Sequence, residues 1–114
     1  MPTPGMPAQT DTLRTLAHGS IGANYAKVGS VFGHSVRMMR IVNATDGDLI
    51  FSDDGVNDKW FLPASTFVLY DYGTNSHLPE GVLCYPQNVQ IWVKQSTAPS
   101  TKSVYIECTY AQGQ

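Results

Sequence analysis

Residues 37–72 constrain the fold most, because their apolar runs are short and turn signals separate the runs. This segment reads RMMRIVNATDGDLIFSDDGVNDKWFLPASTFVLYDY, and no part of it sustains the 3.6-residue apolar period of a helix. Asp46-Gly47 stands between two runs, and Asp and Gly accept the positive backbone angles of a tight hairpin turn. Asp54-Gly55 and Pro63-Ala64 separate the next runs in the same way. The segment therefore predicts consecutive antiparallel strands joined by hairpins, with Gly47 and Gly55 at positive φ.

Alternating apolar and polar residues predict strands along most of the chain. Residues 103–111 alternate most cleanly, with Val104, Ile106 and Cys108 on one face. Residues 96–102 are predicted to be a polar hairpin tip, and residues 73–88 a long loop with a short apolar run at 82–85. The other predicted strands cover residues 13–21, 36–43, 48–52, 59–62, 66–72 and 89–95. Six or seven short strands at this spacing predict an all-β fold, an antiparallel β-sandwich of the jelly-roll or Ig-like (immunoglobulin-like) type.

Length and composition predict one domain with an extended N-terminal arm. The 114 residues are 14% charged and 42% hydrophobic, which suits a β-rich globular domain better than a disordered chain. Residues 1–12 contain three prolines and little that a core would bury. They are therefore predicted to form a flexible arm, and residues 13–114 a single β-sandwich domain.

Net charge and hydropathy argue against two classes of partner. The formal net charge is -2 and the pI is near 5.8, with Lys and Arg scattered along the chain. Specific binding to nucleic acid would need a clustered basic face, so it is not expected. The sequence has no run of about 18 apolar residues and no basic leader followed by an apolar stretch, so neither a membrane span nor a secretory signal is predicted. The chain is expected to be made in the cytoplasm.

The two cysteines, Cys84 and Cys108, most simply remain thiols in that compartment. Cys108 shares a face with Val104 and Ile106, which indicates a buried structural residue. Apolar neighbours would raise the pKa of Cys84 and make it a poor nucleophile. A disulfide between the two, or to a neighbouring subunit, stays open as an alternative, because two cysteines define no framework.

No group of residues has the spacing of a catalytic or metal site, so the protein is predicted not to be an enzyme and to need no cofactor. An acidic cluster around Gly55 lacks the ligand spacing of a calcium loop, and a turn closed by its own side chains is the preferred interpretation. The histidines lie in separate segments without zinc spacing, and no nucleophile-elbow motif is present. The residues concerned are Asp53, Asp54, Asn57, Asp58, His18, His34 and His77.

Four aromatic residues are candidates for an interface. Trp92 and Tyr105 fall on the polar faces of their strands, and aromatic residues are enriched in subunit interfaces. Tyr70 and Tyr72 end an apolar strand and would stack against sugars or a neighbouring subunit, although the core is the more frequent location of such residues. The candidate subunit interface is therefore Tyr70, Tyr72, Trp92 and Tyr105, and the alternative use of Tyr70, Tyr72 and Trp92 is carbohydrate binding.

The order of these motifs resembles that of small virion proteins of tailed bacteriophages, encoded among head and tail-connection genes. The similar segments are residues 37–75, then LPEGV, QIWVKQ and SVYIECTYAQ. Members of that family open with R-x-x-x-I-V-N-x-T-D, continue with D-G-V and F-V-L-Y-D, and close with S-V-Y. The resemblance covers about residues 20–111 and departs from the pattern at the Cys-Tyr-Pro-Gln that begins at Cys84.

This resemblance implies a β-sandwich subunit of the virion that forms a homo-oligomer, as a ring or as copies around the neck or collar, with other head-tail proteins as partners. The protein would be made in the cytoplasm of the host bacterium. Residues 1–12 would reach a neighbouring subunit and add a strand to its open sheet edge. A capsid decoration or head-fibre protein is the alternative within the same class.

Overall fold

The structure is a computed structural model that describes residues 8–71 and 87–111. The described chain is all-β apart from one turn of 3₁₀ helix, His18–Ser20. Two predicted strands are confirmed residue for residue, β4 and β9, whereas β1 and β3 were not predicted. The strands are β1 (Ala8–Thr10), β2 (Arg14–Ala17), β3 (Ala26–Lys27), β4 (Val36–Asn43), β5 (Leu49–Ser52), β6 (Trp60–Leu62), β7 (Thr66–Asp71), β8 (Trp92–Gln95) and β9 (Ser103–Ala111).

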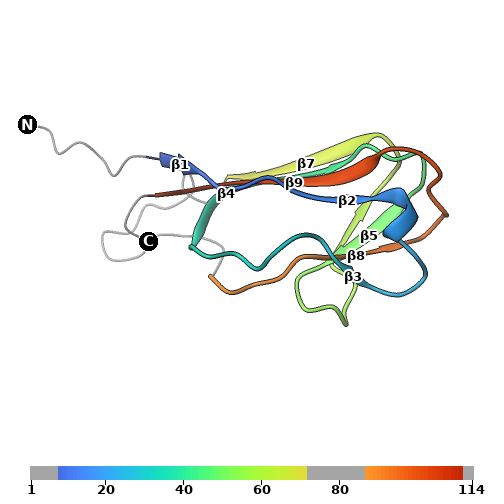
Figure 1. The fold of residues 1–114 in the computed structure, drawn as a ribbon, viewed down its shortest axis with the longest axis horizontal. Helices are drawn as coiled ribbons and strands as arrows, with labels where there is room; N and C mark the ends of the chain where they lie inside the picture. Colours follow the sequence, from blue (N-terminus) through green and yellow to red (C-terminus); the bar gives the residue numbers. More distant parts are fainter. Residues whose placement is uncertain (1–7, 72–86, 112–114) are drawn as a thin grey trace, which may run out of the picture.

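The strands form two antiparallel sheets that pack face to face, which confirms the predicted β-sandwich (Figure 1). Sheet A has the order β1-β9-β4-β7, with β2 also pairing with β9. Because β1 pairs with residues 109–111 and β2 with residues 103–106, these two short strands follow one another along the same side of β9. Sheet B has the order β3-β8-β5-β6.

Strand pairing in the sandwich is nested. β5 pairs with β6 in the middle of the chain, and outward from there β4 pairs with β7, β3 with β8 and β2 with β9. This order arises when one long antiparallel hairpin, with its tip at the β5–β6 turn, folds over so that successive strand pairs fall alternately in sheet B and sheet A. It is the topology of the eight-stranded jelly roll, so of the two predicted sandwich types the jelly roll is the observed one.

Three of the four predicted hairpins are wrong. Asp46-Gly47 joins β4 of sheet A to β5 of sheet B, and Pro63-Ala64 joins β6 of sheet B to β7 of sheet A. Residues 96–102 likewise cross from β8 to β9. Only the turn at Asp54-Gly55 joins two paired neighbours, β5 and β6. Turn residues predict where the chain reverses, but they do not encode which sheet the next strand enters.

Of the two glycines predicted at positive φ, only Gly55 has that conformation. Gly55 has a φ of 74°, as expected for the hairpin. Gly47 is not at positive φ, and its lack of a side chain has a steric reason instead. A Cβ atom there would lie 2.5 Å from the carbonyl oxygen of Thr97 and 2.9 Å from the nitrogen of Pro99. Gly47 thus lets the crossing after β4 approach the crossing after β8.

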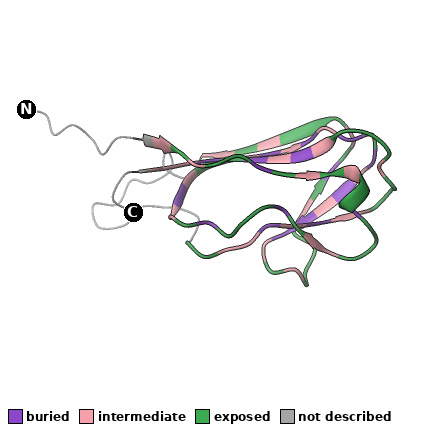
Figure 2. Cartoon of the chain, viewed as in Figure 1, coloured by how far each residue is buried: buried purple, intermediate pink, exposed green. Residues whose placement is uncertain are grey.

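The core lies between the sheets and is built mainly from the alternating residues of β4, β5, β8 and β9. Its largest fully buried side chains include Phe32, Phe51, Met39 and Ile41. Figure 2 shows buried residues concentrated in the middle strands of both sheets and exposed residues along β7. The central strands therefore bury one face against the core, while β7 lies at the edge of its sheet.

One buried polar residue ties the end of the sandwich together. Asn43 is fully buried, and its amide nitrogen donates to the carbonyl oxygens of Gly47, Leu62 and Pro63 at 2.9, 3.0 and 3.2 Å. Its amide oxygen accepts from the backbone N–H and the hydroxyl of Thr45 at 3.0 and 2.6 Å. A single side chain thereby links the crossing from β4 to β5 with the crossing from β6 to β7.

Residues 8–12 of the predicted N-terminal arm, residues 1–12, lie in the folded domain instead. Ala8–Thr10 pair with Ala111–Thr109 of the same chain, so these residues are part of sheet A. Asp11 and Thr12 then contact Arg14, whose side chain is 5% exposed. The Arg14 guanidinium also donates to the carbonyl oxygens of Ser30 and Val31 at 2.7 and 2.9 Å. Residues 8–12 are held by their own domain, and residues 1–7 lie outside the described residues.

Candidate functional site

The outer face of sheet A carries an apolar stripe made of Met38, Phe67 and Leu69. On β7 the side chains of Val68 and Tyr70 pack against the core, so Phe67 and Leu69 point to the opposite face. Their exposed fractions are 58% and 52%, and that of Met38 is 37%. Met38 and Leu69 line one hollow of about 350 Å³ on this face. Contiguous exposed apolar residues of this kind mark interaction sites in soluble proteins.

A surface ion pair lies beside the stripe. The Arg40 guanidinium contacts both carboxylate oxygens of Glu107, at 2.8 and 3.1 Å, across the β4–β9 pair. Its carbon lies 5.3 Å from the centre of the Phe67 ring, within the range of a cation–π contact. Arg40 is thus held between a carboxylate and an aromatic ring, so that its charge is paired on this face.

The stripe runs along an open sheet edge. In the described part of the chain β7 pairs with β4 on one side and with no strand on the other. Its sequence, TFVLYD, has neither Pro nor Lys, the residues that commonly keep an edge strand from pairing with another chain. β7 is therefore the strand of sheet A best suited to accept a further strand.

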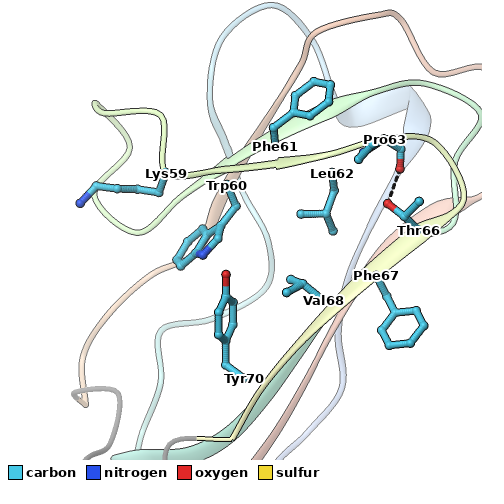
Figure 3. Close-up of a pocket in the computed structure, with 9 residues that line it drawn as sticks. All are labelled: Lys59, Trp60, Phe61, Leu62, Pro63, Thr66, Phe67, Val68 and Tyr70. Atoms are coloured by element: carbon cyan, nitrogen blue, oxygen red, sulfur yellow. Dashed lines mark hydrogen bonds between the residues drawn. The ribbon is translucent and has the colours of Figure 1, made fainter.

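A groove of about 390 Å³ lies between β6 and β7, where the edges of the two sheets meet (Figure 3). Trp60 and Tyr70 face each other across it, with ring centres 6.2 Å apart, and Leu62 and Val68 approach each other farther along. Phe61 and Phe67 point away from the groove. The groove closes at the crossing between the strands, where the Thr66 hydroxyl donates to the Pro63 carbonyl at 2.6 Å.

The structure does not bring the predicted interface residues together. Tyr105 lies half-buried on the outer face of sheet A, and Trp92 lies half-buried on the outer face of sheet B. Tyr70 lines the groove between the sheets, and Tyr72 lies outside the described residues. Tyr105 is thus on the same face as the apolar stripe, while Tyr70 and Trp92 are on two other surfaces.

Trp92 belongs to a compact cluster on sheet B. Its indole ring covers Gly55, where a Cβ atom would lie 2.8 Å from the ring, and the Lys27 ammonium lies 5.6 Å from the ring centre. Nearby, the Tyr25 hydroxyl donates to Asp58, and Lys94 pairs with Asp58 at 3.0 Å. Each charge has a partner, which is typical of a structural cluster.

These contacts shift the ionisation of the cluster in opposite directions. Burial and the hydrogen bond to Asp58 raise the pKa of Tyr25. The same hydrogen bond, together with Lys94, lowers the pKa of Asp58. At neutral pH the hydroxyl therefore stays protonated and the carboxylate stays charged, so the pair is not poised to exchange a proton.

The acidic loop between β5 and β6 is closed by its own side chains, as predicted. The Asp54 carboxylate accepts from the backbone N–H groups of Val56 and Asn57, both at 2.8 Å. These bonds hold the pKa of Asp54 well below its usual range. Across the residues that the structure describes, no three His, Cys, Asp or Glu side chains gather as a metal site.

The remaining candidate residues have local contacts. The His18 ring contacts the Lys102 carbonyl at 3.1 Å, and the His34 ring stacks on Tyr110 with centres 3.8 Å apart. Cys108 is a buried free thiol, which confirms the structural interpretation, and burial raises its pKa to about 11. His77 and Cys84 lie outside the described residues.

The sequence missed the stripe, although a signal was present. In residues 67–70 every side chain is apolar or aromatic, so both faces of this strand are apolar, whereas one face of a strand at a solvated surface is usually polar. Such a pattern on an edge strand indicates a second contact besides the core.

Comparison with protein-family models, curated proteins and solved structures found no match for this chain. Within residues 8–71 and 87–111, no helix has the length and apolar character needed to cross a membrane.

Proposed function

We propose that this chain is a structural subunit of a tailed-phage virion, assembling in multiple copies at the neck or collar where the head meets the tail. The observation that carries the proposal is the open β7 edge with the apolar stripe beside it. Water solvates such a surface poorly, and an assembly subunit buries it against a neighbour. The order of motifs along residues 20–111 supports the virion setting.

The fold and the charge agree with this role. Jelly-roll sandwiches occur in viral capsid domains and in lectins, so the architecture suits an assembly subunit or a sugar-binding module. The formal net charge of -2 would keep the subunit from gripping DNA that passes through a connector. Partners of the subunit would then be copies of itself and other head-tail proteins.

Carbohydrate binding is the second candidate, and one observation weighs against it. A sugar platform needs aromatic rings on one surface, but Tyr70, Trp92 and Tyr105 lie on three different surfaces. Trp92 alone would have to supply the stacking. A capsid decoration or head-fibre protein would use the same assembly chemistry at another place on the particle.

The test is incorporation of the full-length chain into particles that are assembled without it. We expect the wild type to enter the particles and electron microscopy to place it at the neck. Phe67→Lys, which puts a charge into the apolar stripe, should reduce incorporation. Val56→Lys is the matched control, because Val56 is 76% exposed in the β5–β6 loop and away from the stripe.

Three outcomes would contradict the proposal. Failure of the wild-type chain to enter any particle would remove the virion role. Binding to a glycan array that Trp92→Ala abolishes, together with no incorporation, would favour the carbohydrate module. Density on the capsid faces instead of the neck would move the protein to the decoration class.

A further inference from the structure

The groove between β6 and β7 is apolar and opens at the side of the sandwich (Figure 3). In the described part of the chain, β6 is the outermost strand of sheet B and β7 that of sheet A. The rings of Trp60 and Tyr70 face each other across a space of about 390 Å³, which lies within the range of about 300–1,000 Å³ typical of ligand sites. Among the described residues that line it, Lys59 alone is charged, and its ammonium pairs with Asp53 at 3.4 Å. The groove therefore offers aromatic and aliphatic surface with its charge compensated.

Residues 1–7 have a sequence that suits such a groove. They read MPTPGMP, they contain no charged side chain, and Pro4 and Pro7 have the spacing P-x-x-P. Segments of this kind favour the polyproline II conformation and bind in grooves lined by aromatic rings, at low entropic cost because proline restricts the backbone beforehand. The thioether of Met6, between the two prolines, would also pack well against aromatic rings.

The same prolines argue against the addition of residues 1–7 as a strand to a sheet edge. An added strand is held by main-chain hydrogen bonds, and proline has no N–H to donate. Because N–H groups alternate between the two sides of a strand, Pro2 and Pro4 would remove donors from one side and Pro7 from the other. Either side of such a strand would pair incompletely, so the groove is the better site for this segment.

Pro4 to Pro7 of a chain cannot fill the groove of that same chain. Ala8 pairs with Ala111 of β9, and β7 lies three strand spacings, about 14 Å, across sheet A from β1. Through β4, Tyr70 lies level with Cys108, three residues before Ala111, which adds about 10 Å along the sheet. The straight line from Ala8 to Tyr70 is thus about 17 Å, whereas four residues place Pro4 at most about 14 Å from Ala8. Toward its N-terminus β1 also runs away from the level of Tyr70, so the occupant must come from another copy.

We propose that residues 1–7 of one copy bind as a polyproline II segment in the β6–β7 groove of a neighbouring copy, with Pro4 and Pro7 against the rings of Trp60 and Tyr70. The inference rests on the proposed function in that it takes the chain as a subunit that assembles with copies of itself. The contact joins two different surfaces, so each copy gives one segment and receives one. Such a head-to-tail contact repeats from copy to copy and forms a ring where the rotation closes.

A reporter chain tests the contact by nuclear magnetic resonance. The full chain with Pro4→Asp and Pro7→Asp, labelled with ¹⁵N, keeps its groove intact but loses its own docking segment. It has two tryptophans, Trp60 in the groove and Trp92 on the outer face of sheet B, so it gives two indole N–H signals. An unlabelled chain with Tyr70→Ala, which keeps residues 1–7 intact, is added up to millimolar concentration. We expect the Trp60 signal to shift to saturation and the Trp92 signal to stay in place.

Matched titrants separate docking from unspecific contact. An unlabelled chain that carries Pro4→Asp, Pro7→Asp and Tyr70→Ala together should have a Kd at least about tenfold higher. A synthetic peptide of residues 1–8 should shift Trp60 as well, and this titrant does not depend on the folding of a variant. In sedimentation equilibrium the wild type should form oligomers beyond the dimer. The mixture of the reporter chain and the Tyr70→Ala chain should stop at a heterodimer, because it has one intact segment for one intact groove.

Absence of a Trp60 shift with both the Tyr70→Ala chain and the peptide overturns the inference. Equal shifts of Trp60 and Trp92, or equal affinities of the titrants with and without Pro4 and Pro7, also overturn it. Particle incorporation separates this inference from the proposed function. Incorporation at the wild-type level of a chain with Pro4→Asp and Pro7→Asp would contradict only the docking of residues 1–7. Docking by a chain that enters no particle would contradict only the virion role.

Discussion

Replacing Asn43 with alanine should be among the most damaging single changes at a polar residue of this fold. The substitution removes five hydrogen bonds, three donated to carbonyl oxygens and two accepted from Thr45. The carbonyls of Gly47 and Pro63 each keep a hydroxyl donor, from Thr45 and Thr66. The Thr45 N–H and the Leu62 carbonyl lose the bond to the amide outright.

An unsatisfied buried polar group costs about 1–3 kcal/mol, so two of them give a loss of roughly 3 kcal/mol in the free energy of unfolding. Domains of this size are stable by about 5–15 kcal/mol, so a large part of the total is at risk. The melting temperature should fall by on the order of 10 °C. Urea unfolding followed by circular dichroism measures the loss directly, and an unchanged m-value would show that the unfolded state is the same.

Two companion variants test the reasoning. Asn57→Ala removes an exposed side chain that makes one bond to Asp54, at 2.9 Å, and should cost no more than about 0.5 kcal/mol. Asn43→Asp keeps the volume but sets a second oxygen against the three carbonyls, so it should be at least as damaging as Asn43→Ala. A loss below about 1 kcal/mol in Asn43→Ala would refute the idea that this side chain holds the two crossings together.

Four further outcomes follow from local chemistry. Alanine at Gly47 or Gly55 should lower the free energy of unfolding by about 1 kcal/mol or more, through the clash with Thr97 in the first case and positive φ in the second. Asp54 has a folded pKa below the ordinary 3.8, so its contribution to the free energy of unfolding is complete above that value and is lost as pH falls through the folded pKa. Asp54→Asn should therefore weaken the dependence of the free energy of unfolding on pH under acid conditions. Cys108, a buried thiol, should react with iodoacetamide only as fast as the protein opens. EDTA should leave the melting temperature unchanged, since no metal cluster is found in the described part of the chain.

Each of these outcomes has a clear contrary result. Wild-type melting of both glycine variants would remove the steric and the dihedral arguments together. An acid limb that is identical in Asp54→Asn would mean that this carboxylate does not contribute to acid stability. Alkylation of Cys108 at the rate of a free peptide thiol would place it at the surface. A drop in melting temperature with EDTA that calcium restores would make the acidic loop a metal site.

The sequence predicted strands well where alternation is long and one face is buried. β4 and β9 match the predicted bounds because each alternates over eight or nine residues and sits in the middle of a sheet. β3 has two residues, too few to show any period, and it exists because β8 offers it a partner. Connectivity was the harder problem, since Asp46-Gly47 has the chemistry of a hairpin turn but crosses between sheets.

The candidate surface could be predicted only in part. Tyr105 and Trp92 were placed on outer faces correctly, because the alternation of their strands determines which face each side chain takes. Local sequence does not determine which strand lies at the edge of a sheet. The exposure of Phe67 and Leu69 could therefore be recognised only once the strand order was known. Because side chains alternate along β7, Tyr70 faces the core and Phe67 faces solvent.

The nested pairing has a consequence for how this chain must be made. Every strand pair in the described structure joins a strand before the β5–β6 turn to a strand after it, β1 included. Within residues 8–71 and 87–111, neither half contains a sheet of its own. During synthesis on a ribosome none of these strand pairs is therefore available until Trp60 emerges, and the first one is β5 with β6. A chain divided between Asp53 and Lys59 should yield two fragments that are unfolded apart and become a sandwich only on mixing.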